Sequence, residues 1–333
     1  MENTPQQERF TLLRGDALLQ LKTLEPESVH AVITDPPYGL TSKLDVAELL
    51  SAWLNGETFI GEQSGYGGAE WDHSVPGPEL WRETYRLLVP GAYLLAFAAA
   101  RTVGLTTIAL QLAGFDVRDL LHWVYAPGRP SRDQGKLAAE YDDLLLAEQV
   151  AGMRSTFRPG HEPIVVARKP FDDTDTTVLE NYLDFGVGLL DHRSITETDD
   201  AIATNVWVVH DLECDVETCQ CAAMDSGAWS HATHIYPSRE LTDRSLNIPK
   251  PGKAERPVAE DGTKHLTVKP LALMQKLIEA VSGPGQLVLD PFLGSGTTAE
   301  AALLTGRRAV GCELNEEFFP LIEQRFERAT SKQ

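Results

Sequence analysis

Asp35, Pro36, Pro37 and Tyr38 follow a short apolar run, VHAVIT, in the first part of the chain. Neither proline can donate a hydrogen bond to a sheet, so we expect the run to be a strand that ends here and the tetrapeptide to lie in a loop. The Asp35 carboxylate and the Pro36 carbonyl are acceptors on a rigid backbone. Such acceptors can localise the lone pair of a planar amine and stabilise the charge that develops on it. The Tyr38 ring offers a face for an unstacked base, so the loop is suited to methylating an exocyclic amine.

A glycine-rich loop, LDPFLGSGTT, occupies residues 289–298. Gly294 and Gly296 let the backbone turn tightly and approach a ligand, and the helix expected after them offers free N–H groups. The strand expected next ends at Glu313, whose carboxylate can accept hydrogen bonds from ribose hydroxyls. This pattern predicts a site for a nucleoside.

The glycine loop could bind either of two nucleoside-containing cofactors, a nicotinamide dinucleotide or S-adenosylmethionine. Together with Ala299, the glycines satisfy the dinucleotide pattern G-x-G-x-x-A, which keeps a nicotinamide-dependent oxidoreductase open as an alternative. Asp290 and Pro291 precede the turn, however, and a carboxylate there suits a cationic sulfonium better than a pyrophosphate. The loop also lies about 40 residues from the C-terminus, too late for the second half of a dehydrogenase. S-adenosylmethionine is therefore the expected cofactor.

Methylation of a ring carbon would need a thiolate nucleophile. None of the four cysteines follows a proline in such a loop, and Cys312 lies inside an expected strand, where it is most simply a core residue.

Alternating strand and helix patterns must position these loops, which favours an α/β fold with a mostly parallel sheet and helices on both faces. The sheet must be completed by the N-terminal strands. Strands are expected at 29–34, 92–99, 117–126, 286–290 and 307–314, and helices at 79–91 with a Pro-Gly stop, 103–115, 268–283, 296–306 and 315–329.

Composition narrows the class of protein. The 333 residues include 29 Lys or Arg and 49 Asp or Glu, for a net charge of -20, and 42% are hydrophobic. No apolar run approaches the roughly 20 residues that span a bilayer, and the first residues lack the apolar core of a signal peptide. Four cysteines are too few for a disulfide framework, so a cytoplasmic protein without a membrane partner is expected.

The charge is unevenly distributed along the chain. Residues 171–236 contain 14 Asp or Glu and one basic residue, Arg193, so a polyanionic partner would have to avoid most of this segment. The regular pattern breaks over about the same stretch. We therefore expect a catalytic half at 1–170, an acidic insert that includes the target-recognition region at 171–262, and a cofactor-binding half at 263–333.

The motifs and their order resemble the amino-methylating DNA methyltransferases, adenine-N6 or cytosine-N4, of the circularly permuted β class. TDPPYG at 34–39 resembles the catalytic motif, LDPFLGSGTT the cofactor motif, and KHLTVKP at 264–270 the H-x-T-x-K-P segment. GDAL around Asp16 and GCELNEEF around Glu313 match as well. WDHSVP and HEPIVVARKP are similar to members common in bacteriophages and restriction-modification systems. The chain has Gly91 and Ala92 where the family commonly has a glycine pair.

The resemblance implies a Rossmann-like methyltransferase fold, DNA as the partner and base flipping. Asp-Pro-Pro-Tyr favours adenine, because cytosine members more often carry Ser in place of Asp. The implied catalytic residues are Asp35, Pro36, Pro37 and Tyr38. The implied cofactor-binding residues are Asp16, Thr267, Lys269, Asp290, Pro291, Phe292, Gly294, Gly296, Thr297 and Glu313.

Other residues are candidates for contacts with DNA. Trp71 and Asp72 are candidates for the border of a pocket that holds the flipped base. The candidate phosphate contacts are Arg129, Arg132, Lys136, Arg154, Arg158, Arg239, Arg244, Lys250, Lys253 and Arg256. His210, Cys214, Cys219 and Cys221 lie close together in the sequence, but their spacing is irregular for zinc. A zinc site therefore stays open, and no metal ligand is assigned. The sequence leaves open whether the protein forms a homodimer.

Three further alternatives remain from the sequence. Similar loops serve any planar amine, so RNA or a protein glutamine could be the acceptor. The third alternative is a DNA-binding protein that keeps the fold but catalyses no reaction, although the intact motifs argue against it.

Overall fold

The structure is a computed structural model. It describes residues 9–40, 44–59, 75–124, 132–157, 160–195, 202–209, 233–235, 256–258, 262–263, 265 and 268–331.

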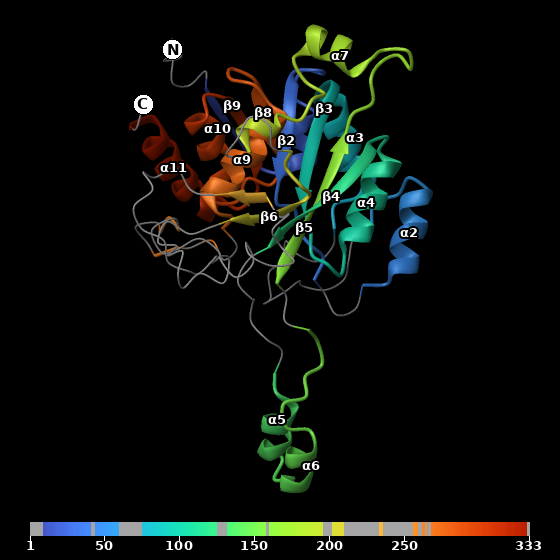
Figure 1. Ribbon diagram of the computed structural model, residues 1–333, viewed down its shortest axis with the longest axis vertical. Helices are drawn as coiled ribbons and strands as arrows, with labels where there is room; N and C mark the ends of the chain where they lie inside the picture. Colours follow the sequence, from blue (N-terminus) through green and yellow to red (C-terminus); the bar gives the residue numbers. More distant parts are fainter. Residues whose placement is uncertain are drawn as a thin grey trace.

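Nine strands among the described residues form one sheet in the order β1-β9-β8-β2-β3-β5-β4-β6-β7 (Figure 1). Their bounds are β1 (Phe10–Arg14), β2 (Val29–Thr34), β3 (Leu88–Phe97), β4 (Asp116–Val124), β5 (His161–Arg168), β6 (Val206–Val209), β7 (Thr233–Ile235), β8 (Leu287–Asp290) and β9 (Arg308–Glu313). β5 runs antiparallel to β3 and β4, and the other pairs are parallel. The sheet is therefore mostly parallel, as predicted.

The two C-terminal strands, β9 and β8, lie next to each other between the N-terminal strands β1 and β2. Ala31 of β2 pairs with Val288 of β8, and β1 pairs along its whole length with β9. The N-terminal strands thus complete the sheet that the C-terminal strands begin, which confirms the predicted Rossmann-like α/β fold. Because β2 and β8 are parallel neighbours, the loops that follow them leave the same edge.

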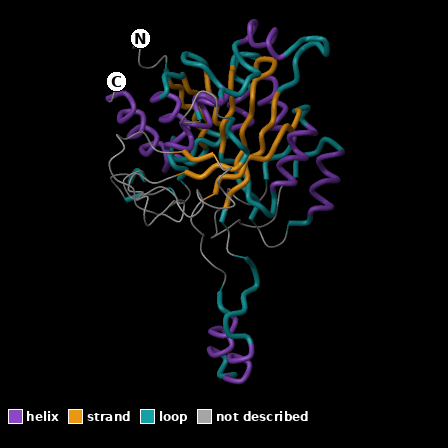
Figure 2. The backbone as a smooth tube through the Cα atoms, viewed as in Figure 1, coloured by secondary structure: helices purple, strands orange, loops and turns teal. Residues whose placement is uncertain are grey.

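Helices cover both faces of the sheet (Figure 2). One apolar core includes residues of α1 (Ala17–Leu21), α2 (Val46–Leu54), α3 (Pro78–Leu87) and α4 (Val103–Leu112). The other includes residues of α9 (Leu271–Val281), α10 (Thr297–Leu304) and α11 (Phe319–Ser331). The strands lie between the two cores, so β2 and β3 are buried along nearly their whole length.

The boundary between α3 and β3 differs from the prediction. The Pro-Gly pair at 90–91 was expected to end a helix, but α3 ends at Leu87 and β3 begins at Leu88. Gly91 adopts φ +79° and its N–H donates to Lys169 O, while the Pro90 carbonyl accepts from Asn181 Nδ2. Long-range partners therefore satisfy this backbone, and a register shift between β2 and β3 accommodates the irregular start.

Two further described segments add to this arrangement. α5 (Gln134–Glu140) and α6 (Leu144–Gln149) pack on each other away from the sheet (Figure 1). The expected insert contributes α7 (Val178–Phe185), the short helix η3 (His192–Ser194), and strands β6 and β7, which extend the sheet beyond β4. The predicted domain boundaries stay a prediction. No helix in the part of the chain that the structure describes is both long and apolar enough to cross a membrane.

Candidate active site

Asp35 lies directly after β2 in a cluster of charged side chains. Tyr38 Oη donates to Asp35 Oδ1 at 2.6 Å, and Lys269 Nζ donates to Asp35 Oδ2 at 2.5 Å. Lys269 Nζ is also 3.3 Å from Glu162 Oε2 and 3.1 Å from Tyr38 Oη. Two carboxylates, an ammonium and a phenol from three distant parts of the chain therefore meet at one edge of the sheet.

The cluster is shielded from water, which shapes its protonation. Burial lowers the pKa of Lys269, but Asp35 and Glu162 more than offset this effect and raise the pKa, so the ammonium stays charged. Burial and the same two carboxylates raise the pKa of Tyr38 well above its usual range, so the phenol keeps its proton. The phenol can therefore act as a hydrogen-bond donor at neutral pH.

Asp290 connects the Asp35 loop to the glycine loop. Its Oδ1 accepts from the Thr34 hydroxyl at 2.6 Å and from Phe292 N at 3.0 Å, and its Oδ2 accepts from the Thr298 hydroxyl at 2.6 Å. The side chain is buried, and burial raises the pKa of Asp290 to about 6 in spite of these donors. Asp290 therefore fixes the end of β2 against the start of α10.

The glycine loop adopts a backbone that side chains would oppose. Gly294 has φ +55° and Gly296 has φ +87°, both in the left-handed region. A Cβ on Gly294 would lie 3.0 Å from His265 Nε2, and one on Gly296 would lie 3.3 Å from Ile322 Cα. Gly296 is the N-cap residue of α10. Thr297 is the first residue of the helix, and it is buried. The two glycines therefore allow a tight turn at the N-terminus of a buried helix.

Two further carboxylates lie where β1 and β9 end at the same edge. Glu313 is the last residue of β9, and its oxygens accept from Gly294 N at 2.7 Å and Asn315 N at 2.8 Å. Burial raises the pKa of Glu313 to about 6. Asp16, just after β1, is exposed and caps α1 by accepting from Leu19 N. The structure brings these predicted cofactor residues together with Asp290 across three adjacent strands.

These residues fit S-adenosylmethionine. At the N-terminus of α10 the turn carries no side chains at Gly294 and Gly296, and the flanking carboxylates suit the hydroxyl and ammonium groups of that cofactor. Glu313 would hold the ribose, Asp16 would face the adenine, and the turn at residues 291–297 would border the methionine part. When bound, S-adenosylmethionine supplies a methyl group on a positively charged sulfur.

Several predicted residues lie outside the described residues. They are Thr267, Trp71, Asp72, Arg129, Arg158, Arg239, Arg244, Lys250, Lys253, His210, Cys214, Cys219 and Cys221.

Two of the described candidates for phosphate contacts are already paired. Arg132 donates to Glu140 at 2.5 Å, and Arg154 lies 3.5 Å from Asp133, both within the segment that carries α5 and α6. A phosphate would have to compete with these carboxylates, whereas Lys136 is exposed in the same segment.

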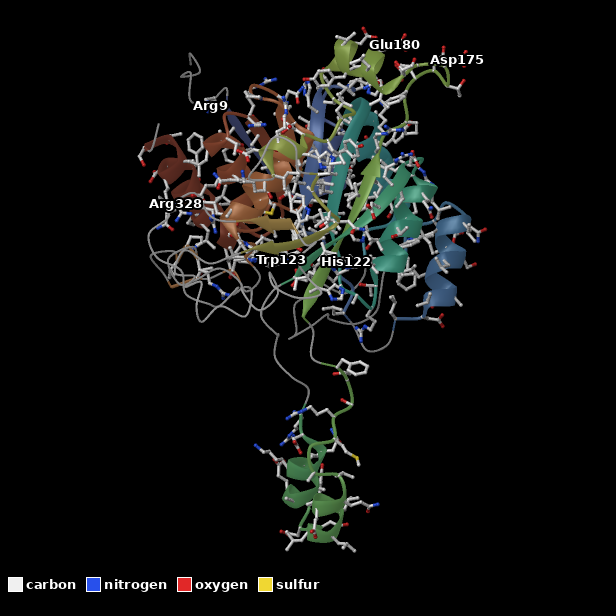
Figure 3. All side chains as sticks on the ribbon, in the orientation of Figure 1. Arg9, His122, Trp123, Asp175, Glu180 and Arg328 are labelled. Carbon is white, nitrogen blue, oxygen red and sulfur yellow. The ribbon has the colours of Figure 1, made fainter. Side chains whose placement is uncertain are left out.

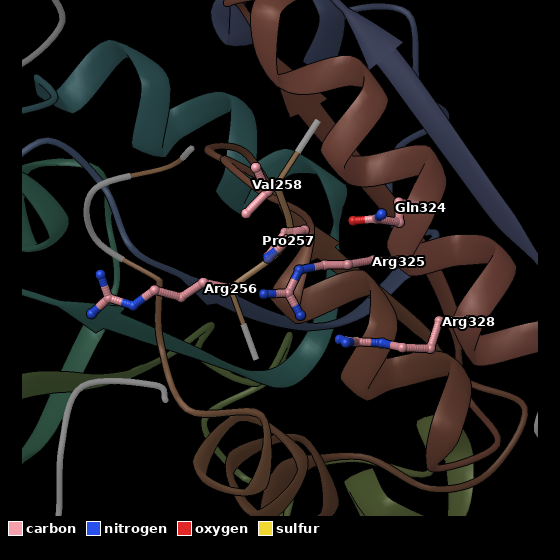
Figure 4. A pocket seen from close by; sticks show the side chains of 6 residues that line it. All are labelled: Arg256, Pro257, Val258, Gln324, Arg325 and Arg328. Atoms are coloured by element: carbon pink, nitrogen blue, oxygen red, sulfur yellow. The ribbon is translucent and has the colours of Figure 1, made fainter. Parts of the chain in front are cut away.

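Arg256 lines a cavity of about 400 Å³ with Pro257, Val258, Gln324, Arg325 and Arg328 (Figure 4). Arg325 and Arg328 both extend from α11 and both bind the carboxylate of Glu300, which is 1% exposed. Among the residues that the structure describes, none of the predicted catalytic or cofactor residues lines this cavity.

The acidic helix α7 lies at the opposite end of the strands from Asp35. Asn181 of α7 donates to Pro90 O at the start of β3, whereas Asp35 follows the end of the parallel strand β2. Figure 3 shows Asp175 and Glu180 far from His122 and Trp123, which lie near the end of β4. The described part of the acidic segment that carries α7 therefore leaves the Asp35 edge open.

Three side chains at this edge belong to segments matched to the family but were not among the predicted site residues. Glu162 contacts Lys269, Thr34 contacts Asp290, and the His265 ring packs 4.6 Å from Phe318 beside Gly294. Glu162 stands directly before an apolar run, PIVVA, within a segment already matched to the family. Its place at the site depends on β5 being antiparallel, which no local pattern reveals.

A methyltransferase-type sheet with an acidic Asp-Pro-Pro-Tyr loop beside a glycine loop defines the class of this protein. The sequence profile of the DNA methylase family matches residues 29–324. The chain therefore belongs to that family, and it is an S-adenosylmethionine-dependent DNA methyltransferase that acts on an amino group.

Individual relatives agree with this assignment. The chain is 27% identical to the Type II methyltransferase M.HindIII of Haemophilus influenzae, with 94% of each chain covered. It is 25% identical to the DNA adenine methyltransferase YhdJ of Escherichia coli, with 97% of this chain and 84% of YhdJ covered. Among solved structures, the cytosine-N4-specific PvuII DNA methyltransferase superposes with a TM-score of 0.53 at 14% identity, covering 97% of this chain and 90% of that one. That last likeness concerns the fold alone.

Proposed function

We propose that the protein methylates N6 of adenine in DNA, with Asp35 as the residue that binds the target amine. The observation that carries this proposal is the hydrogen-bonded link from Thr34 to Asp290, which holds the Asp35 loop beside the glycine loop. An amine bound by Asp35 is thereby placed next to the residues that fit the cofactor.

The side chains at the Asp35 loop have distinct roles in this proposal. Asp35 accepts a hydrogen bond from the amine, and the Pro36 carbonyl is a second acceptor. Both stabilise the positive charge that develops on the nitrogen. The ring of Tyr38 stacks on the flipped base. Pro37 keeps the loop rigid, which limits the entropy lost when the base is positioned.

The preference for adenine is supported by two observations. The loop carries Asp35 where cytosine-N4 members of the resembling family more often carry Ser, and one full-length relative is named a DNA adenine methyltransferase. The likeness to the cytosine-N4-specific enzyme is confined to the fold.

DNA would approach the edge of the sheet at which Asp35 lies. The acidic helix α7 is at the other edge, so the repulsion between its carboxylates and phosphates is weakened by distance and by salt.

The test is transfer of a labelled methyl group to duplex DNA, followed by digestion to nucleosides and mass identification of the modified base. N6-methyladenine is the expected product, and N4-methylcytosine would contradict the adenine assignment. Asp35→Ala should abolish transfer while cofactor binding, measured by calorimetry, is retained. Competition with RNA and with a glutamine-containing peptide distinguishes the acceptor classes, since only duplex DNA should reduce labelling of the DNA substrate.

A further inference from the structure

Glu162 lies at the start of β5, beside the residues that the proposed function uses. β5 runs antiparallel to β3, so its first residues reach the edge at which β2 ends. Glu162 is 8% exposed, and its Oε2 lies 3.3 Å from Lys269 Nζ and 3.4 Å from Tyr38 Oη. It therefore contacts both of the groups that donate to Asp35.

Lys269 is shared between two carboxylates. Its ammonium lies 2.5 Å from Asp35 Oδ2 and 3.3 Å from Glu162 Oε2, and the side chain is 7% exposed. Inside a protein such charges interact strongly because little water screens them. Without Glu162, Asp35 would be the one carboxylate among the described residues within ion-pair distance of this ammonium.

The sharing matters because Asp35 has two tasks. Its oxygens already accept from Tyr38 and Lys269, and methyl transfer requires it to accept from the substrate amine as well. A carboxylate that carries the whole charge of a buried ammonium is a weaker acceptor for a third donor. A second carboxylate also gives the cluster of Asp35, Lys269 and Glu162 a net negative charge, which favours the positive charge that develops on the amine.

We propose that Glu162 is a positioning residue for methyl transfer: it shares the Lys269 ammonium and the Tyr38 hydroxyl with Asp35, and so keeps Asp35 available to the amine. This inference rests on the proposed function, because it takes Asp35 as the residue that binds the amine. Glu162 acts through Lys269 and Tyr38.

The chain offers a control at the opposite end of β5, where another buried lysine pairs with a glutamate. Lys169, just beyond the other end of β5, has a side chain that is also 7% exposed, and its Nζ pairs with Glu27 Oε1 at 2.9 Å. Glu27→Gln therefore removes a carboxylate from a buried lysine at the opposite edge of the sheet. Both variants lose a lysine partner, but only one of them lies at the Asp35 loop.

The experiment compares the full-length wild type with Glu162→Gln, Glu162→Asp and Glu27→Gln in the DNA methylation assay. Glu162→Gln should lower kcat by about 100-fold, the scale of a displaced reacting group. The cofactor Kd, measured by calorimetry, should change by less than about 3-fold. Glu162→Asp should recover part of kcat, and Glu27→Gln should leave kcat at the wild-type value. A purely structural role predicts instead that Glu162→Gln lowers the melting temperature without a specific loss of kcat.

A double-mutant cycle tests whether Glu162 acts through Lys269. If it does, adding Glu162→Gln to Lys269→Met should lower kcat far less than Glu162→Gln lowers it in the wild type. Equal losses in both backgrounds would overturn the proposal, as would a wild-type kcat for Glu162→Gln. The proposed function fails in a separate way, through normal turnover of Asp35→Ala, so the two failures can be told apart.

Discussion

The hydroxyl of Thr34 donates a 2.6 Å hydrogen bond to Asp290, which lies 256 positions later in the chain. Thr34 ends β2 immediately before Asp35, and Asp290 ends β8 immediately before the glycine loop. One buried contact therefore joins the two loops to which we assign the target amine and the cofactor.

Thr34→Val should weaken this junction. Asp290 would stay buried with one donor fewer, which should lower the free energy of unfolding by about 1–3 kcal/mol in urea titrations. Thr34→Ser, which keeps the hydroxyl, should be close to wild type. The control is Thr107→Val, because that hydroxyl donates only to Val103 O within α4. Equal losses for Thr34→Val and Thr107→Val would contradict the junction.

Gly296→Ala and Gly104→Ala should change stability in opposite directions. Gly296 has φ +87° and a Cβ there would lie 3.3 Å from Ile322 Cα, so alanine should cost about 1–3 kcal/mol and weaken cofactor binding. Gly104 lies in α4 with no heavy atom within 4 Å of an added Cβ, so alanine should stabilise by up to about 1 kcal/mol. Thermal unfolding and calorimetry measure both effects. A Gly296→Ala protein as stable as Gly104→Ala would refute the requirement for glycine.

Cofactor binding should weaken in acid. Burial raises the pKa of Glu313 to about 6, so the side chain is ionised above pH 6 and takes up a proton below it. A protonated Glu313 is a poorer acceptor for ribose hydroxyls, so the Kd should rise about tenfold per pH unit below 6 and be flat above 7. Calorimetry from pH 5 to 8 measures this profile. Glu313→Gln should bind more weakly at pH 8 and show a shallower slope, while a wild-type Kd that is constant from pH 5 to 8 would exclude the role of Glu313.

Arg325→Met should destabilise the protein far more than Arg14→Met. Arg325 is 1% exposed and binds the buried Glu300, which would be left with Arg328 alone. Removing the only partner of a buried charge costs about 3–5 kcal/mol, and because Arg328 still binds Glu300 we expect a loss at the lower end of that range. Arg14 pairs with Glu323 at the surface, where such pairs contribute about 1 kcal/mol or less. Denaturant unfolding should separate the two variants, and similar values would show that the Glu300 cluster contributes no more than a surface pair.

The sequence by itself determined the local features of the site. The apolar run before Asp35 predicted a strand that ends at the prolines, and β2 ends at Thr34. The spacing of Gly294 and Gly296 predicted a turn before a helix, and both residues adopt positive φ. These features follow from proline chemistry, glycine conformation and hydrophobic periodicity, each of which acts within a few residues.

Only the tertiary structure decided which distant residues meet. Glu162 reaches Lys269 because β5 is antiparallel, and Pro90 and Gly91 join β3 because Asn181 and Lys169 satisfy their backbone. Strand direction and order are set by packing two apolar cores against one sheet, which depends on contacts between residues far apart in the chain. A charged residue beside an apolar run has the same local pattern whether it lies at the active edge or at the opposite one.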